Sequence, residues 1–329
     1  MKILILDANS ILNRAFYGIR SLSTKDGIFT NGIYGFLNIL MKLKEQVEPD
    51  KIFAAFDLKA PTFRKEIYPE YKAGRKPQPQ ELTMQFPILK EILELYGVSV
   101  LQKEGYEADD FLGTVARLCG QRDFECYIAT GDRDSLQLVN KTTTVLLAAT
   151  KAGQPELRVY TPERIFEIYG VMPIQLIDVK ALMGDASDNI PGVAGVGEKT
   201  ALALIARFRS LDGVYGNIES PDIKSGVRQK LLKDKENAYM SLKLGTICKE
   251  VPCDISFEQN PADIDGLKKK LASLELFRII KRMGLENAGK KARGASAERQ
   301  IEVEPSKDAP DITEKFFPVI IKREGGTAA

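Results

Sequence analysis

Cys126-Tyr-Ile-Ala-Thr-Gly-Asp-Arg-Asp134 is the stretch of this 329-residue chain that decides its fold class, because it is a short apolar run that ends in acids. Similar apolar runs recur in the first half of the chain and alternate with helical patterns; the runs are 2–6, 51–56, 98–101 and 124–130, and the helical patterns are 33–46, 82–96 and 107–119. Repeated strand-helix-strand units force a parallel sheet covered by helices. We therefore expect an α/β fold that binds its ligands beyond the carboxyl ends of the strands.

Three of the expected strands end in aspartate. Asp7 follows the first strand, Asp57 the second, and Asp132 and Asp134 the run at 124–130. Taken singly, Asp7 and Asp57 are well explained as N-caps of the helices that follow. The carboxyl ends of parallel strands meet at one edge of a sheet, however, and carboxylates brought together there repel unless a cation or a proton lies between them. Their joint placement predicts a cation site.

Two further acidic segments are expected at the same edge. Glu107, Asp109 and Asp110 begin a helical pattern, and Glu107 and Asp110 share a helix face through their i, i+3 spacing. Asp185 and Asp188 lie three residues apart on a loop that contains glycine and serine. Alternatives remain open, since acids in a first helical turn complement the helix dipole and an aspartate-rich loop forms hydrogen-bonded turns by itself.

The chain contains no histidine, which excludes His-based metal sites and Ser-His or Cys-His catalysis. Oxygen ligands alone select hard cations, Mg²⁺ or Mn²⁺ before Zn²⁺. The candidate carboxylates are too many for a single Mg²⁺ ion, which keeps several of its waters, so we expect two or more ions. Two such ions can activate a water and stabilise the leaving oxygen, which points to phosphodiester hydrolysis.

The composition indicates a globular protein. Apolar residues make up 44% of the chain, and the net charge is only +2, so any nucleic-acid surface must come from segregation of charge. The four cysteines form no CxxC pair, which favours buried free thiols. The N-terminal apolar run is too short for a signal peptide and no stretch could span a bilayer. We therefore expect a cytoplasmic protein with no membrane partner.

The segment 59–76 combines basic and aromatic residues. It contains six basic residues against two acids, the mixture that backbone phosphate contacts and base stacking require. A solvated basic loop is the alternative. Lys72 and Arg75 follow closely after Tyr71 and are suited to gripping or polarising the phosphate that is cut.

A second candidate phosphate site is the glycine-rich segment 189–202. Gly192, Gly195 and Gly197 precede a helical pattern, and glycines expose backbone N–H groups at the positive end of a helix. The segment is not a P-loop, because Glu198 separates Gly197 from Lys199. A glycine-rich turn between two helices explains the same residues.

Together these motifs resemble the flap-endonuclease family, and within it the 5′-nuclease domains of bacterial DNA polymerase I. The resemblance covers roughly residues 1 to 285 and rests on Asp7, on Asp57 and on five segments in this order: 63–75, 105–110, 131–134, 184–189 and 190–200. It implies a PIN-like α/β fold with two metal sites and a helical arch above the active site. It also implies a helical, helix-hairpin-helix-type (H3TH) subdomain that grips duplex DNA beside a monovalent ion, with K⁺ as the candidate.

The resemblance also implies roles for individual residues. The first metal cluster would be formed by Asp7, Asp57, Glu107, Asp109 and Asp110, and the second by Asp132, Asp134, Asp185 and Asp188. Lys72 and Arg75 would lie at the arch base near the scissile phosphate as catalytic residues, and Tyr71 would stack on a terminal base. The DNA would be bound by Arg64, Gly192, Gly195, Gly197, Lys199 and Thr200. All the family's carboxylate positions are acidic here, so an active enzyme is expected.

The expected domain order is a PIN-like nuclease domain at 1–175 with its arch at about 60–100, an H3TH subdomain at 176–285, and a linker and tail at 286–329. The tail begins with small and charged residues, as linkers do. Its later apolar segment resembles the start of a further domain. A free-standing nuclease and a fragment of a longer polymerase both fit this pattern.

The sequence thus predicts a structure-specific 5′ nuclease, a 5′-3′ exonuclease or flap endonuclease that removes 5′ flaps or RNA primers in replication and repair. The expected partners are DNA with a 5′ flap, a nick or a single-stranded 5′ end, an RNA–DNA hybrid, and a polymerase domain in cis or in trans. Two alternatives are a DNA-structure-binding module without catalysis, which the complete set of acids argues against, and a PIN-type ribonuclease, which the glycine motif disfavours.

Overall fold

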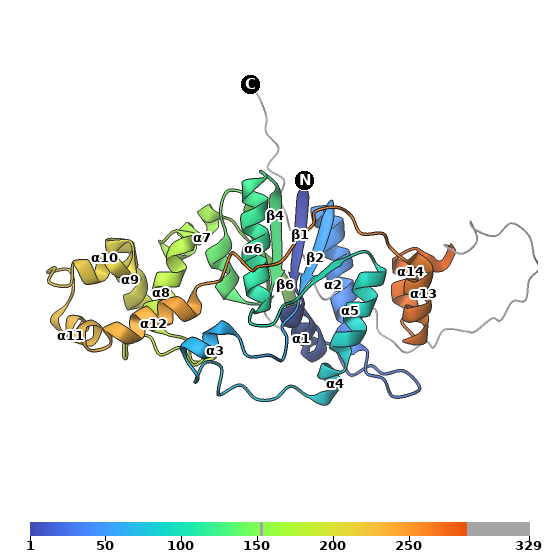
Figure 1. Cartoon of the computed structure of the whole chain (residues 1–329), viewed down its shortest axis with the longest axis horizontal. Helices are drawn as coiled ribbons and strands as arrows, with labels where there is room; N and C mark the ends of the chain where they lie inside the picture. The colour runs from blue at the N-terminus through green and yellow to red at the C-terminus, as the bar shows by residue number, and fades with distance from the viewer. Residues whose placement is uncertain (152–153, 288–329) are drawn as a thin grey trace, which may run out of the picture.

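The computed structural model describes residues 1–151 and 154–287, and its centre is a 6-stranded sheet in the order β3-β2-β1-β4-β5-β6 (Figure 1). The strands are β1 (Lys2–Asp7), β2 (Lys51–Ala55), β3 (Ser99–Leu101), β4 (Glu125–Thr130), β5 (Thr143–Lys151) and β6 (Gln154–Tyr160). The pairs from β3 to β5 are parallel, and β6 runs antiparallel to β5. The expected, mostly parallel α/β sheet is confirmed, and the antiparallel edge formed by β5 and β6 adds to it.

Alternate residues of β1 face two different layers of helices. Leu4 and Leu6 are buried in a core with helices α1, α2 and α5, whereas Ile3 and Ile5 are buried in a second core with α6. These helices are α1 (Ala8–Gly18), α2 (Asn31–Val47), α5 (Gln85–Leu95) and α6 (Ala108–Gln121). Both faces of the central strand are therefore covered, as in other parallel sheets, and the strand ends are left for polar residues.

The strand register aligns the carboxyl ends of the central strands. Leu6 of β1 pairs with Ala54 of β2 and with Ala129 of β4. Asp7 ends β1, while Asp57 and Asp132 come shortly after the last residues of β2 and β4. The acids that end these strands consequently lie at one edge of the sheet, as the sequence predicts.

A third core is built from helices and their connecting loops, without a strand among the described residues, and lies to one side of the sheet (Figure 1). Its helices are α8 (Leu176–Met183), α9 (Glu198–Phe208), α10 (Leu211–Gly216), α11 (Ser225–Lys233) and α12 (Lys235–Gly245). They follow α7 (Pro162–Tyr169) and a short 3-10 turn, η2 (Pro173–Gln175). Among the described residues, no helix is both long and apolar enough to cross a membrane.

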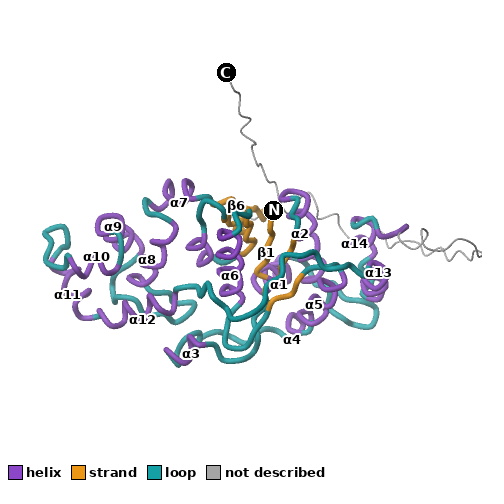
Figure 2. Tube along the Cα trace, turned by 45° about the horizontal axis from the view of Figure 1, so that its top comes forward, coloured by secondary structure: helices purple, strands orange, loops and turns teal. Residues whose placement is uncertain are grey.

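The chain then returns to the sheet. α13 (Ile264–Ser273) and α14 (Phe277–Arg282) bury Leu267, Leu271 and Ile280 in the core that also holds α2 and α5. Figures 1 and 2 show these helices at the opposite end of the molecule from α9, α10 and α11. The helical subdomain expected at 176–285 therefore does not continue to residue 285, because α13 and α14 bury their apolar faces against the first unit. Except for residues 286 and 287 in η3 (Leu285–Asn287), the expected linker and tail lie outside the described residues.

The region 60–100, expected as an arch, contains two kinds of structure. α3 (Phe63–Ile67) and α4 (Gln80–Thr83) are short helices joined by turns and coil (Figure 2). α5 instead belongs to the sheet core, where Leu89 and Ile92 are fully buried. The expected arch stays a prediction, and it could include only the part before α5.

The cysteines differ in part from the expectation. All four are free thiols, and Cys119 and Cys126 are buried, but Cys253 is exposed. Cys253 lies between α12 and α13, where residues 252–254 are exposed.

Candidate metal centre and nucleic-acid interface

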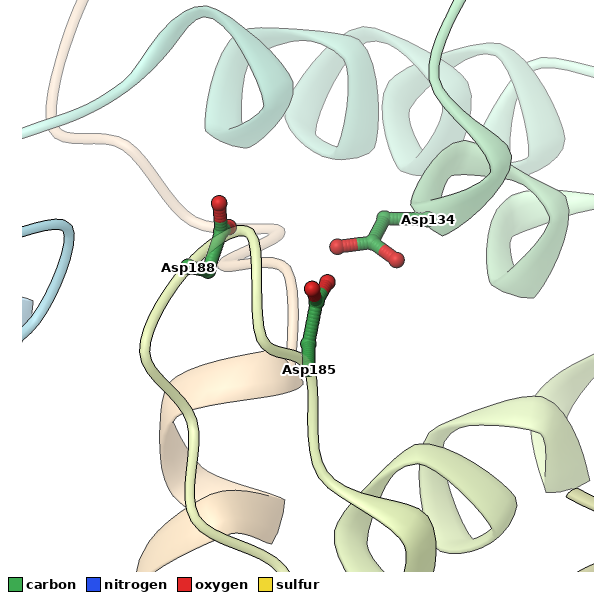
Figure 3. Close-up of side chains that lie close together, drawn as sticks. All are labelled: Asp134, Asp185 and Asp188. Atoms are coloured by element: carbon green, nitrogen blue, oxygen red, sulfur yellow. The ribbon is translucent and has the colours of Figure 1, made fainter. Parts of the chain in front are cut away.

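Three aspartates from two segments converge beyond the end of β4 (Figure 3). Asp134 lies in the 3-10 helix η1 (Arg133–Leu138), whereas Asp185 and Asp188 lie on the loop after α8. One carboxylate oxygen from each lies within 4.8 Å of the other two. The backbones of Asp185 and Ile190 pair through two hydrogen bonds of 2.8 Å, which close the loop, and Asp188 is buried. This arrangement could hold a metal ion.

Asp7 is buried beside this group and has two roles. Its Oδ1 accepts a hydrogen bond from the Ser10 N–H at 2.9 Å, so the N-cap interpretation holds. Its Oδ2 accepts from Thr130 Oγ1 at 2.7 Å. Burial raises the pKa of Asp7 to about 7 against these hydrogen bonds, and repulsion from Asp57 and Asp132 contributes. Capping alone therefore does not compensate the negative charge at this position.

Asp109 and Asp134 add two more negative charges close to Asp7 and Asp132. Burial raises the pKa of Asp109 well above its ordinary value, and repulsion from Asp7, Asp132 and Asp134 adds to the effect. Burial also raises the pKa of Asp134 to about 6. Clustered carboxylates whose pKa is raised favour a shared cation, and a set of oxygen donors suits a hard divalent one. The residues present thus fit the metal chemistry that the sequence predicts.

Asp57 and Glu107 lie at the start of α6. Asp57 is exposed, and its Oδ1 accepts from the Ala108 N–H at 2.7 Å, so it caps α6 with one oxygen. Glu107 Oε1 accepts from Lys72 Nζ at 2.9 Å, and its Oε2 lies 3.5 Å from Arg64. Both acids reach the edge of the sheet, although each also has a local structural role.

Lys180 is a site residue that the sequence analysis does not single out. Its ammonium group is bonded to Asp134 and lies 2.7 Å from Asp185 Oδ2. Burial would raise the pKa of Asp185, but the bonds from Lys180 and Ser187 lower it to about 2. The one feature of the sequence that could have pointed to Lys180 is its place among the apolar residues of α8, which are buried in the structure. That signal is weak, because such a lysine could pair with any nearby acid.

The basic segment 59–76 folds back onto the carboxylates at the carboxyl edge of the sheet, which we call the acidic edge. Lys72 bonds to Glu107, and Arg75 forms an ion pair with Asp188. The Lys72 N–H also donates to the Asp188 carbonyl at 2.9 Å. Both cations therefore lie beside carboxylates of the two expected clusters, a position compatible with contact to a phosphate bound there.

The glycine-rich segment forms a turn and the start of α9. Gly192 and Gly195 have φ values of 61° and 72°, and a Cβ at Gly192 would lie 2.3 Å from the Gly184 nitrogen, so only glycine fits there. Gly197 is the N-cap of α9, and no side chain caps this terminus. Lys199 is exposed in the first turn and Thr200 is half-buried. The glycine-rich turn is therefore present as expected, and uncapped N–H groups at a helix N-terminus attract anions, so the phosphate interpretation stays a prediction.

Comparison with known proteins identifies the family. The model of the 5′-3′ exonuclease N-terminal resolvase-like domain matches residues 2–170, and the model of the 5′-3′ exonuclease C-terminal SAM fold matches residues 171–269. The chain belongs to the 5′-3′ exonuclease family.

Curated relatives of this family member are bacterial polymerases. It is 41% identical over 319 residues to DNA polymerase I of Caldicellulosiruptor bescii, covering 96% of this chain and 36% of the relative. It is 40% identical over 317 residues to DNA polymerase I of Bacillus subtilis (strain 168), covering 95% of this chain and 35% of the relative. The chain therefore spans about a third of the length of these relatives.

Solved structures share the fold at lower identity. The T5 D15 protein co-crystallised with metal ions has a TM-score of 0.61 and 20% identity, covering 87% of this chain and 100% of that chain. The catalytic core of Rad2 in complex with DNA substrate has a TM-score of 0.56 and 20% identity, covering 85% of this chain and 91% of that chain. The predicted family and fold class are thus confirmed.

In this member of the 5′-3′ exonuclease family, Asp110 is bound to Arg64, whose guanidinium group also lies 3.5 Å from Glu107. Arg64 donates to both carboxylate oxygens of Asp110, at 2.8 and 2.9 Å, and those oxygens also accept the N–H groups of Glu107 and Cys248 at 2.9 Å. Both side chains are buried. A buried charge needs a partner, and each of these two supplies the other's. The metal role expected of Asp110 and the DNA contact expected of Arg64 therefore disagree with the structure.

Tyr71 departs from its expected role as well. Its side chain is buried with Ile190 and Leu244, and its hydroxyl donates to Glu107 Oε2 at 3.2 Å. Burial raises the pKa of this hydroxyl. A ring enclosed in this way cannot stack on a base from its present position. Tyr71 instead holds the Glu107 carboxylate in place through its hydroxyl.

Proposed function

We propose that this chain is a structure-specific 5′ nuclease that hydrolyses phosphodiester bonds of DNA with divalent cations bound at the carboxyl edge of its sheet. The observation that carries the proposal is the convergence of Asp134, Asp185 and Asp188 beside Asp7 and Asp109, in a chain without histidine. The 5′-3′ exonuclease family supplies the class of reaction, and the acidic edge supplies a place for the cations.

Two groups of carboxylates would hold the cations, now without Asp110. The first group is Asp7, Asp57, Glu107 and Asp109, and the second is Asp132, Asp134, Asp185 and Asp188. We propose Mg²⁺, with Mn²⁺ as a substitute, because the donors are oxygens throughout. When bound, two such cations activate a water and stabilise the leaving oxygen.

The chain's own cations would orient the phosphate that is cut. The side chain of Arg75 is 51% exposed, so it can turn from Asp188 towards an incoming phosphate. A guanidinium group can donate to two phosphate oxygens at once, and Lys72 adds a second positive charge on the same side. These side chains bind and orient, and the reaction requires no protein nucleophile.

The duplex part of the substrate would be bound by the helical core. The proposed contacts are the turn and first helical residues of α9, that is Gly192, Gly195, Gly197, Lys199 and Thr200. A K⁺ ion beside this turn is part of the proposal, although Lys230 Nζ, 3.0 Å from the Gly195 carbonyl, already brings positive charge there.

The proposed substrates are DNA with a 5′ flap, a nick or a single-stranded 5′ end, and RNA–DNA primer hybrids. Residues 60–84, with α3 and α4, would form the arch through which a free 5′ end passes. A polymerase domain would act with the nuclease in cis or in trans, in the cytoplasm.

The test is cleavage of a 5′-labelled flap duplex in Mg²⁺, with EDTA as the blank. Asp185→Asn removes one carboxylate from the cluster, and Asp50→Asn is the control, because Asp50 is exposed and bonds to the Lys2 N–H at the far end of β1. We expect cleavage by the wild type and the control, and a rate at least about 100-fold lower for Asp185→Asn.

Two other outcomes would replace the proposal. Tight DNA binding by the wild type without Mg²⁺-dependent cleavage would indicate a binding module. Faster cleavage of single-stranded RNA than of flap DNA would indicate a ribonuclease.

A further inference from the structure

Residues 244–248 connect the helical core to the sheet, and buried side chains from three elements hold them. Arg64 of α3 donates to two carbonyls of this segment, at 3.0 and 3.1 Å. Gln137 of η1 bonds to two of its peptide groups, as donor and as acceptor, at 3.0 Å each. Asp110 of α6 accepts its last N–H at 2.9 Å. None of these three side chains belongs to a residue more than 4% exposed.

The same three elements carry or contact residues of the acidic edge. α6 contains Asp109, and η1 contains Asp134. α3 contributes Arg64, which is bound to Asp110 and lies 3.5 Å from Glu107. The segment 244–248 is therefore fastened to the framework that places the carboxylates.

The other end of this connection reaches the turn formed by Gly192, Gly195 and Gly197, which we call the glycine turn. The segment continues from α12, whose Ser241 Oγ accepts the Gly192 N–H at 2.9 Å. The residue before α12, Asp234, accepts the Ala194 N–H at 2.9 Å. A series of hydrogen bonds thus runs from the proposed duplex contact, through α12 and the segment, to the acidic edge.

We propose that Arg64 and Gln137 are positioning residues that determine where the DNA is cut. They fix the distance between the glycine turn, where the duplex is bound, and the carboxylates, where the phosphate reacts. This inference rests on the proposed function.

Stability alone does not account for the arrangement. Apolar residues often replace a buried ion pair without loss of stability, whereas a buried, fully bonded polar network permits only one geometry. A displacement of about 1 Å between bound substrate and reacting groups can reduce a rate on the order of 100-fold. Loosening the segment should therefore change the cleavage position and rate before it changes DNA affinity.

The experiment measures product lengths on a 5′-labelled flap duplex at single-nucleotide resolution, with DNA affinity measured in EDTA by fluorescence anisotropy. The test variant is Gln137→Met, which removes both bonds to the segment without leaving an unpaired charge. The control is Lys51→Met. Lys51 is also buried and also fastens a distant segment, through the Glu258 carbonyl and Asn260 Oδ1, but that segment does not lead from the glycine turn to the acids.

We expect Gln137→Met to give products displaced by a nucleotide or more, or spread over several lengths, with little change in DNA affinity. Lys51→Met should keep the wild-type product lengths. If Gln137→Met does not fold, Ser241→Ala interrupts the same connection at its other end, loses a single hydrogen bond, and should give the same displacement.

Wild-type product lengths and rate in a folded Gln137→Met variant, or in Ser241→Ala if that variant has to be used, would overturn the inference. Failure of the proposed function gives a different result, because the wild type itself would then leave the flap duplex uncut. The two failures are therefore distinguishable in one experiment.

Discussion

The free energy of unfolding of the metal-free protein should fall as the pH rises from about 4.5 to about 7.5. Burial raises the pKa of Asp7 from 3.8 to about 7 and that of Asp134 from 3.8 to about 6. Over much of this range each carboxyl group is protonated in the folded chain and ionised in the unfolded chain. Since the folded state binds more protons, a rise in pH favours unfolding.

The expected size of this effect follows from the burial of Asp7. The full change in its pKa from 3.8 to about 7 corresponds to about 4 kcal/mol, at 1.36 kcal/mol for each pH unit, and about 3 kcal/mol of it falls between pH 4.5 and 7.5. This is a large part of the roughly 5–15 kcal/mol by which folded proteins are stable. A divalent cation binds the ionised carboxylates of the folded state, so Mg²⁺ should restore much of the loss near pH 7.5 and have little effect near pH 4.5.

The assay is urea unfolding followed by circular dichroism across this pH range, in EDTA and in Mg²⁺. Asp7→Asn should flatten the pH dependence of the metal-free protein. The range stops above the pH at which Asp185, whose pKa is lowered to about 2, and other paired acids become protonated. A metal-free protein whose stability stays level or rises from pH 4.5 to 7.5 would contradict this prediction.

Three substitutions test other parts of the account. Arg75→Ala should slow single-turnover cleavage about 100-fold while weakening DNA binding in EDTA much less, and equal losses would show an ordinary backbone contact. Lys180→Met should lower metal-free stability in urea by about 3 kcal/mol, because it leaves Asp134 and Asp185 without their ammonium partner; an unchanged midpoint would contradict this. Gly192→Ala should cost at least about 2 kcal/mol in thermal unfolding, given its φ of 61° and the contact with Gly184.

Gly197→Ala is the matched control for the last of these. Gly197 has no neighbouring atom within 4 Å of a built Cβ and serves as the N-cap of α9. Its replacement should cost about 1 kcal/mol or less. Equal losses of stability at Gly192 and Gly197 would show that the close approach to Gly184 is unimportant.

The fold and the general location of the site could be predicted from the sequence because both depend on local patterns. Apolar runs of strand length specify β1, β2 and β4, and parallel pairing then brings Asp7, Asp57 and Asp132 to one edge. The return of α13 and α14 to the sheet could not be predicted in the same way. An amphipathic helix shows that it buries one face, but not against which partner.

The direction of individual side chains was also beyond the sequence. Asp109 and Asp110 are neighbours in a helix, so their side chains point in directions about 100° apart: one faces the acids and the other faces Arg64 and residues 244–248. Lys180 becomes a site residue only because α8 packs beside η1. Such roles depend on tertiary contacts between distant segments, which no local spacing encodes.

The central claim is that the carboxyl edge of the sheet binds divalent cations, and the most direct test is an anomalous difference map from crystals grown with Mn²⁺. We expect a peak bonded to oxygens of Asp134, Asp185 and Asp188, and its loss in crystals of Asp185→Asn. A well-ordered wild-type crystal with Mn²⁺ bound elsewhere, and none at these aspartates, would contradict it.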